Sequence, residues 1–214
     1  MWKLIKRVLY LLVLFHLLFI FLGRFYNPPV TITQIQGFLK YKKLDRNYIS
    51  YDDMGDAIKK AILASEDQKF FSHNGFDFKE IKKAIEQNRK RKITRGASTI
   101  SQQTAKNIFL WQERSWFRKG LELIFTFMIE AVWTKKIILD RYLNCVEMGQ
   151  GVFGVEAASR YYFGKSAKNL SDSEAAWIAA VLPNPQKYDP RRPSAYLKKK
   201  HRWIMKQMKN IVLK

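Results

Sequence analysis

The longest apolar run of the chain lies at its N-terminus, where Val8 to Gly23 carries no formally charged side chain. At about 1.5 Å per residue, this run is slightly shorter than the ~30 Å hydrocarbon core of a bilayer. Leu4, Ile5 and flanking basic side chains that reach the headgroups extend it to a workable span. No small-residue cleavage site follows, only the sequence GRFYNPP. The pattern therefore favours an uncleaved membrane anchor over a cleavable signal peptide or a buried helix.

Beyond this run the apolar positions recur mostly at helical spacing, which predicts one predominantly α domain on the anchor. The alternation VTITQI at 30–35 predicts a short strand, and the glycines of GQGVFG at 149–154 predict a flexible loop. The charged run at 89–96 predicts another loop. Residues 117–133 are apolar almost all round, which predicts a buried core helix. The other predicted helices cover residues 56–66, 76–87, 98–108 and 135–146, and a segment that ends near Phe163 before a capping Gly164. A further helix is predicted to begin at the capping box 171–174 and to end at Pro183, and a last one to begin near Ser194.

The net charge of the chain limits the kinds of partner that it can bind. The chain of 214 residues has 39 Lys and Arg against 18 Asp and Glu, a formal net charge of +21. Such an excess favours nucleic acid, an anionic membrane or a phosphorylated substrate as partner. Basic residues crowd the N-terminal side of the anchor, so the positive-inside tendency places the N-terminus in the cytoplasm and the main domain outside it. We therefore expect no nucleic acid partner.

Glu66 ends the predicted helix at 56–66 and leads into a segment with acidic, aromatic and histidine side chains before a glycine turn. A carboxylate in a partly dehydrated, aromatic setting is suited to proton transfer near neutral pH. We expect Asp67 and Phe70 to support this carboxylate, and His73 to stabilise the turn rather than transfer protons. The alternative is that Glu66 and Asp67 are ordinary surface acids at a helix end.

A second polar segment, GASTISQQTAKN, covers residues 96–107. A glycine turn that leads into Ser98 presents free backbone N–H groups at a helix start, which is a natural anion site. Gln102, Gln103 and Lys106 add amide donors and a charge within the next two turns. The alternative is a plain helix cap followed by a polar helix.

Together these segments resemble a known family. The chain is similar to the monofunctional peptidoglycan glycosyltransferases, a family that also forms the N-terminal module of class A penicillin-binding proteins. The resemblance covers about residues 45–205, with one departure, because Asp140 stands where the fourth block of the family usually has Glu. No transpeptidase domain is expected. The matching blocks are EDQKFFSHNG (66–75), GASTISQQTAKN (96–107), RKGLE (118–122), KKIILDRYLN (135–144) and RYYFGK (160–165).

The resemblance implies a lysozyme-like, two-lobed helical domain with a groove between a larger lobe and a smaller, membrane-facing one. It also implies the reaction. The growing glycan on undecaprenyl diphosphate is the donor, and the 4-hydroxyl of the lipid II disaccharide is the acceptor. Glu66 matches the general base of the family, and a single displacement inverts the anomeric centre.

The resemblance also assigns substrate contacts. Lys106 and Arg114 match the diphosphate contacts of the family, and fixed cations stabilise the charge that the leaving group develops. Ser98, Gln102 and Gln103 are expected to help position the donor.

Two matches have competing interpretations. Glu122 matches the second glutamate of the family pattern, as a catalytic partner of the cations or a group that steers the donor phosphates. The bare sequence favours an ordinary pairing of Glu122 with Arg118 or Lys119. Tyr162 matches a substrate-contacting tyrosine, although it could equally be a core residue.

The segment at 108–117 combines apolar bulk with Arg114. This mixture suits a segment that dips into the headgroup region, which an enzyme with a lipid-bound substrate needs. Ordinary core packing explains the same residues equally well.

We expect a single-pass protein of the bacterial cytoplasmic (inner) membrane with its catalytic domain on the outer, periplasmic face. Its expected partners are lipid II, the lipid-linked growing glycan and membrane lipid, with other cell-wall synthesis and division proteins left open. No covalently bound cofactor and no metal-ligand cluster are expected, while a divalent cation (Mg²⁺ or Mn²⁺) accompanying the diphosphate stays open. The expected segments are a cytoplasmic tail at 1–7, the anchor at 8–26, a linker at 27–44, the glycosyltransferase domain at 45–205 and the basic end of the last helix at 206–214.

Two rival functions remain. A lytic glycan-cleaving enzyme of similar fold would also use a glutamate acid, but its uncharged scissile bond needs no phosphate-binding cations. A basic, membrane-anchored scaffold protein predicts that Glu66→Gln changes nothing measurable. The order of the motifs favours the glycosyltransferase over both.

Overall fold

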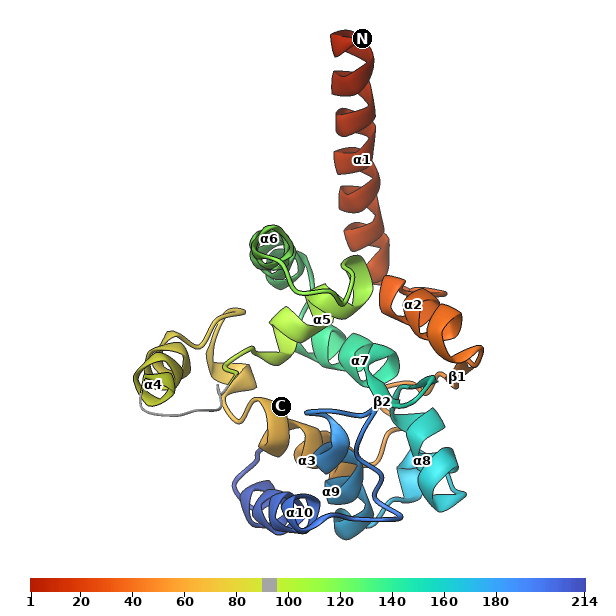
Figure 1. Cartoon of the computed structure of the whole chain (residues 1–214), viewed down its shortest axis with the longest axis vertical. Helices are drawn as coiled ribbons and strands as arrows, with labels where there is room; N and C mark the ends of the chain where they lie inside the picture. The colour runs from red at the N-terminus through yellow and green to blue at the C-terminus, as the bar shows by residue number, and fades with distance from the viewer. Residues whose placement is uncertain (90–95) are drawn as a thin grey trace.

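The computed structural model of the chain describes residues 1–89 and 96–214. Its first helix, α1 (Trp2–Gly23), stands away from the other elements for most of its length (Figure 1). It is long and apolar enough to cross a membrane. Its last turns belong to the fold, because Ile20 is buried and its carbonyl accepts a hydrogen bond from Trp133 Nε1 at 2.7 Å. The apolar helix is therefore docked on the domain.

The segment after α1 is folded as well. The helix α2 (Ile32–Tyr41) stands where the alternation at 30–35 predicts a strand, so that prediction was wrong. Thr31 and Gln34 form a capping box, in which each side chain accepts a hydrogen bond from the backbone N–H of the other residue. Such a box begins a helix, and it outweighs so short an alternation.

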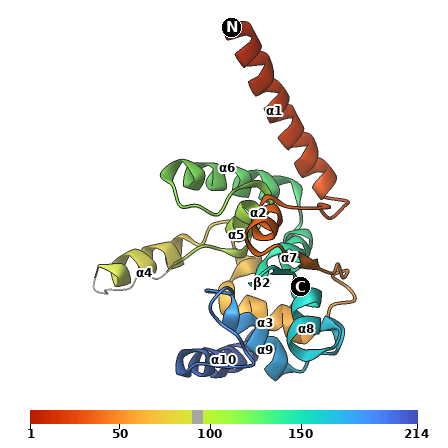
Figure 2. The same cartoon turned by 45° about the vertical axis from the view of Figure 1, so that its right-hand side comes forward.

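One group of helices lies farthest from α1 (Figures 1 and 2). In this group α3 (Asp56–Glu66) packs against α9 (Asp172–Val181) and α10 (Ala195–Met208). Fully buried alanines on α9 let these helices approach closely, and Ile58 and Ile62 of α3 fill the space between them. This group holds a large part of the hydrophobic core.

Helix caps confirm several boundaries that the sequence predicts. Ser171 and Glu174 form the capping box of α9, and Ser194 caps α10. The helix α8 (Val155–Phe163) ends at Gly164, whose φ of 68° favours glycine.

A second group of helices lies toward α1. It consists of α5 (Ile100–Phe109), α6 (Trp116–Val132) and α7 (Lys135–Cys145), with α5 packed against both others. The ends of these helices agree with the sequence prediction within one or two residues, which is the usual uncertainty of a helix end.

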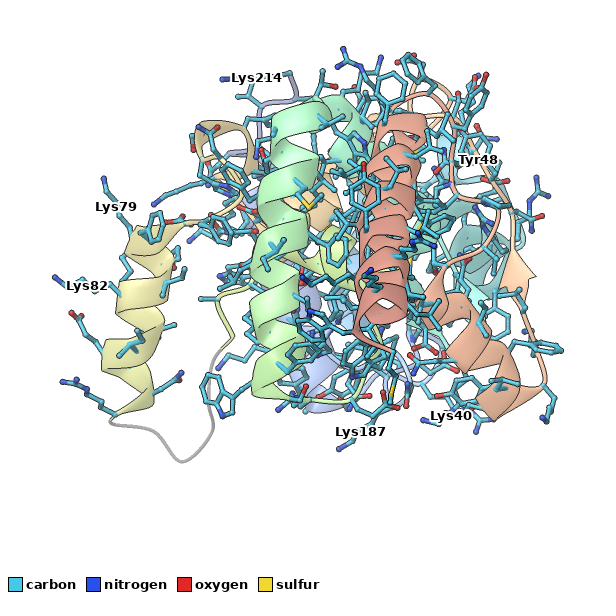
Figure 3. All side chains as sticks on the ribbon, turned by 90° about the horizontal axis from the view of Figure 1, so that it is seen from above. Lys40, Tyr48, Lys79, Lys82, Lys187 and Lys214 are labelled. Carbon is cyan, nitrogen blue, oxygen red and sulfur yellow. The ribbon has the colours of Figure 1, made fainter. Side chains whose placement is uncertain are left out.

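The prediction that α6 is buried all round was wrong. Phe125 and Ile129 face the core, but Ile124 and Phe127 on the same helix are exposed. The C-terminal half of α1 contacts α6, with the rings of His16 and Phe125 5.4 Å apart, and the two helices overlap in the view from above (Figure 3). The second face of α6 is therefore apolar without being covered by the described part of the chain.

A small sheet replaces the flexible loop that the glycines at 149–154 predict. Its strand order is β1 (Asp45–Arg46), β3 (Val152–Phe153), β2 (Glu147–Gly149), with β3 parallel to β1 and antiparallel to β2. Gly151 and Gly154 have positive φ values, which tighten the hairpin and its exit. These glycines serve a compact turn with a fully buried strand.

The remaining elements lie around the two groups. The helix α4 (Phe78–Asn88) extends sideways from the molecule (Figure 1), and short 3₁₀ helices cover Phe70–Ser72 and Ala167–Asn169. Residues 90–95 of the predicted charged loop lie outside the described residues.

Candidate active site

Glu66 is the last residue of α3, where the sequence predicts the helix end. Its side chain is 15% exposed and opens on a cavity of about 540 Å³. Oε1 accepts a hydrogen bond from Ser65 Oγ at 2.8 Å and lies 3.8 Å from Lys200 Nζ. Oε2 accepts a hydrogen bond from Gln103 Nε2 at 3.0 Å. Groups from α3, α5 and α10 therefore hold this carboxylate in place.

The cavity is lined by residues from α3, α4, α10 and the segment before α5. Ser98 lies on one wall, and Trp203 and Gln207 of α10 lie on another. An open cavity with convergent polar groups around a carboxylate is the default candidate for an active site.

Gln103 connects Glu66 to a residue that sequence reasoning missed. Tyr142 on α7 is 1% exposed, and its hydroxyl donates a hydrogen bond to Gln103 Oε1 at 3.0 Å. Burial, together with the charges of Glu66 and Asp67, raises the pKa of Tyr142 well above its usual value. Its position on the apolar side of a predicted helix gave no sign of this contact.

The turn after α3 is braced from several sides. Asp67 accepts a hydrogen bond from the backbone N–H of Ile100, the first residue of α5, at 3.1 Å. His73 Nε2 lies 3.0 Å from the same carboxylate. Phe70 is fully buried, with Lys135 Nζ 4.5 Å from the centre of its ring. This arrangement fits a supporting role for Asp67, Phe70 and His73.

Ser98 and Gln102 occupy different environments. Ser98 is exposed and lines the cavity. Gln102 is buried, and its Oε1 accepts a hydrogen bond from the backbone N–H of Thr99 at 3.0 Å in the capping box of α5. Ser98 is thus open to a ligand, whereas the side-chain oxygen of Gln102 already has a structural partner.

A second charged centre lies one turn along α5 from Gln103. Glu122 of α6 is buried and pairs with Arg118 Nη1 at 2.8 Å and with Lys119. Burial lowers the pKa of Lys106, and the negative charge of Glu122 opposes that shift. Glu122 is therefore a counterion of cations, the pairing that the bare sequence favours.

Arg114 adds to this charge from the exposed loop between α5 and α6, near enough to lower the pKa of Lys106 further. Several cations around one buried carboxylate give the centre a net positive charge, which suits a phosphate group. Among residues 1–89 and 96–214, no three His, Cys, Asp or Glu side chains converge as metal ligands.

Two residues of the matched blocks bond to groups outside the surroundings of Glu66 and Glu122. Tyr162 on α8 is half-buried and donates its hydroxyl to the carbonyl of Met148 at 2.8 Å. Asp140 is buried, pairs with Arg141 and accepts a hydrogen bond from Asn27 Nδ2 at 3.1 Å. The carboxylate at position 140 thus ties α7 to the segment after α1.

Lys200 was also missed by sequence reasoning. It is the last of three consecutive lysines on α10, of which Lys198 and Lys199 are exposed. Lys200 turns toward Glu66, and burial lowers its pKa while the Glu66 charge opposes the shift. Three neighbouring lysines look alike in sequence, so only the packing of α10 on α3 distinguishes them.

Residues 31–209 match the family model described as transglycosylase. The chain is 55% identical over 171 residues to a biosynthetic peptidoglycan transglycosylase of Mannheimia succiniciproducens, covering 80% of this chain and 70% of that protein. It is 53% identical over 178 residues to a Haemophilus influenzae protein of the same name, covering 83% and 72%. A Bacteroides thetaiotaomicron protein of that name is 46% identical over 196 residues, covering 91% and 79%.

Proposed function

The chain belongs to the transglycosylase family, and we propose that it polymerises glycan from lipid II, with Glu66 as the general base. Membership makes the protein a glycosyltransferase of peptidoglycan synthesis, which confirms the resemblance in its sequence. The position of Glu66 carries the proposal. Gln103 and Lys200 hold this carboxylate at the edge of the cavity. Gln103 lies on α5 one turn before Lys106, around which the cations gather.

In the proposed reaction, the growing glycan on undecaprenyl diphosphate is the donor and lipid II is the acceptor. Glu66 takes the proton of the acceptor's GlcNAc 4-hydroxyl while that oxygen forms a bond to the donor's anomeric carbon. The bond from this carbon to the diphosphate breaks, and undecaprenyl diphosphate leaves with the electron pair. Attack from the side opposite the leaving group inverts the anomeric centre.

The leaving diphosphate is proposed to bind at the cationic centre. Lys106 and Arg114 would stabilise the charge that develops on it, and the planar guanidinium of Arg114 can hold two phosphate oxygens. Both oxygens of Glu122 are already paired with Arg118 and Lys119. The side chains of this centre therefore offer positive charge to the diphosphate.

Other substrate contacts follow the same arrangement. We propose that Ser98 and Gln103 position the donor, because one lines the cavity and the other touches Glu66. Tyr162 is proposed as a contact farther along the substrate.

The apolar surface near α1 supports a place at the membrane. We propose that α1 spans the inner membrane with its N-terminus in the cytoplasm, so that the catalytic part lies on the periplasmic face. The exposed Phe127 of α6 and the exposed Trp116 and Phe117 at its start would then enter the headgroup region. Within the segment at 108–117, the buried Phe109 and Leu110 belong to the core, whereas the exposed Trp116 and Phe117 are free to contact the headgroup region.

Polymerisation of purified lipid II in detergent tests the proposed function. The variants are Glu66→Gln and, as a control, Glu86→Gln on the exposed surface of α4. We expect polymer from the wild type and from Glu86→Gln, and about 10²-fold less or none from Glu66→Gln, because an amide cannot accept the proton. Circular dichroism establishes that each variant is folded.

Two results would contradict this proposal. A folded Glu66→Gln variant with full activity would remove Glu66 from the role of base. A wild type that makes no polymer but degrades isolated cell-wall sacculi would establish the lytic rival instead.

A further inference from the structure

A chain of hydrogen bonds runs from the core to the cavity through Tyr142, Gln103 and Glu66. The Tyr142 hydroxyl donates to Gln103 Oε1 at 3.0 Å, and Gln103 Nε2 donates to Glu66 Oε2 at 3.0 Å. Tyr142 is fully buried, Gln103 is half-buried, and Glu66 reaches the cavity. One amide group therefore joins a buried hydroxyl to the proposed base.

The two neighbours of Gln103 set the direction of its amide. An ionised carboxylate only accepts hydrogen bonds, so Nε2 must face Glu66 and Oε1 must face Tyr142. The reverse orientation would place the amide oxygen against the carboxylate. Without the Tyr142 hydroxyl, Oε1 would lose its donor on the buried side, and the amide would lose the contact that fixes its plane.

We propose that Tyr142 is a positioning residue of the transfer reaction, whose hydroxyl fixes the Gln103 amide so that Nε2 stays bonded to Glu66 and orients its carboxylate. The inference rests on the proposed role of Glu66 as base, and it adds a residue that touches no substrate. A hydrogen bond donated to a carboxylate favours the ionised form. We therefore expect the loss of that bond to move the acid limb of the pH profile of kcat/KM to higher pH.

We expect the other groups that face Glu66 to keep their contacts in Tyr142→Phe. That hydroxyl itself does not titrate in the working range, because burial and the nearby carboxylates raise the pKa of Tyr142 well above its usual value. The remaining groups are Lys200 and Tyr196 on α10, Ser65 and Asp67 beside Glu66, and the carbonyl of Ala179 on α9, which accepts from Ser65.

The test is the pH profile of lipid II polymerisation by Tyr142→Phe, with Tyr51→Phe as the matched control. Tyr51 is a half-buried tyrosine between Lys59 and Lys136, outside the proposed site. For Tyr142→Phe we expect the acid limb of kcat/KM to move up by about one pH unit, with about tenfold lower activity on that limb. KM should change little, and Tyr51→Phe should keep the wild-type profile.

A second variant tests the same bonds from the other side. Gln103→Leu should move the acid limb by a similar amount, and adding Tyr142→Phe to it should move the limb no further, because both changes break one connection. If Tyr142→Phe fails to fold, Gln103→Leu alone decides, and an unmoved limb overturns the inference.

Two other outcomes overturn it while leaving the proposed function intact. One is a folded Tyr142→Phe variant with the wild-type acid limb. The other is an equal loss of activity at every pH, which a purely structural role would give. A wild type without polymerase activity would overturn the proposed function, and this inference with it.

Discussion

Lys106 and Lys200 are lysines that the fold places in partly buried positions beside carboxylates. Burial lowers the pKa of each, because it disfavours the charged ammonium, while Glu122 and Glu66 respectively oppose the shift. Each lysine thus keeps a cation close to a group that carries charge in the proposed reaction. The two have different tasks, because Lys106 faces the proposed diphosphate site and Lys200 contacts the proposed base.

Lys106→Arg is predicted to move the alkaline limb of kcat/KM to higher pH. With its pKa lowered, Lys106 loses its proton at a lower pH than an exposed lysine, and the contact with the diphosphate is lost as pH rises through that value. Arginine stays charged over the whole range. Lys106→Met should lose about 10²-fold at pH values below the alkaline limb, where the wild-type Lys106 is charged. Polymerisation rates across pH measure this, and an alkaline limb shared by wild type and Lys106→Arg would mean that another group sets it.

Lys200→Met is predicted to move the acid limb to higher pH by at least about half a unit, because a nearby cation favours the ionised carboxylate. Lys199→Met, at the exposed neighbouring position, should leave the profile unchanged. Lys200→Arg should keep the wild-type limb, since it retains the charge. The pH profile of kcat/KM is measured for all three variants. An equal effect of Lys199→Met would mean that the shift comes from the general surface charge and not from the contact of Lys200 with Glu66.

At the scale of elements, α5 organises the site. Its N-terminus receives the carboxylate of Asp67, so the turn after α3 is fixed to the helix that carries Gln103. Lys106 follows Gln103 by one turn and lies on the same face of the helix. The opposite face is buried through residues such as Ala105 and Ile108. Any change that loosens α5 therefore displaces both Gln103, which contacts the proposed base, and Lys106 of the cationic centre.

Gln102→Ala is predicted to lower the free energy of unfolding by about 1 kcal/mol, because the backbone N–H of Thr99 loses its acceptor. Gln102→Glu keeps an acceptor at this position of the capping box and should keep the stability. KM for lipid II should stay near the wild-type value in both. Denaturant titration and steady-state kinetics measure these effects. A raised KM at unchanged stability would support the substrate contact that the sequence predicts for Gln102.

At the scale of the whole molecule, α1 and the catalytic part meet through a close interface. A side chain at Gly23 would come within 2.6 Å of Trp133 Cζ2, so this position needs glycine for the approach. Arg24 adds a hydrogen bond to the carbonyl of Val132 at 3.1 Å. With α1 fixed on α6, the depth of one helix in a bilayer sets the depth of the other. The family match begins at residue 31, directly after this junction.

Phe127→Asp is predicted to lower polymerisation of lipid II in vesicles by about tenfold, because a carboxylate on the exposed face of α6 resists entry into the headgroup region. Phe78→Asp is the matched control, since Phe78 is similarly exposed but lies on α4, apart from α1 and α6 in Figure 3. Turnover in vesicles and in detergent is measured for both. Equal losses in the two media would count against membrane contact at this face.

Features that depend on neighbouring residues could be predicted before the structure was known. The sequence predicted the apolar run of α1 and helix caps such as Ser171 and Ser194, because caps and periodicity depend only on nearby residues. The segment around Glu66 and the order of the motifs identified the family and its chemistry in the same way. Local patterns therefore predicted most helices and the candidate base.

Which side chains meet depends on how distant segments pack together. Tyr142 and Lys200 reach the site from α7 and α10, and no local pattern distinguishes them from other core or surface residues. The exposed face of α6 and the hairpin at 149–154 were mispredicted for a related reason, since burial depends on what packs against a segment. A side chain gains its role from partners far along the chain, and packing alone brings those partners together.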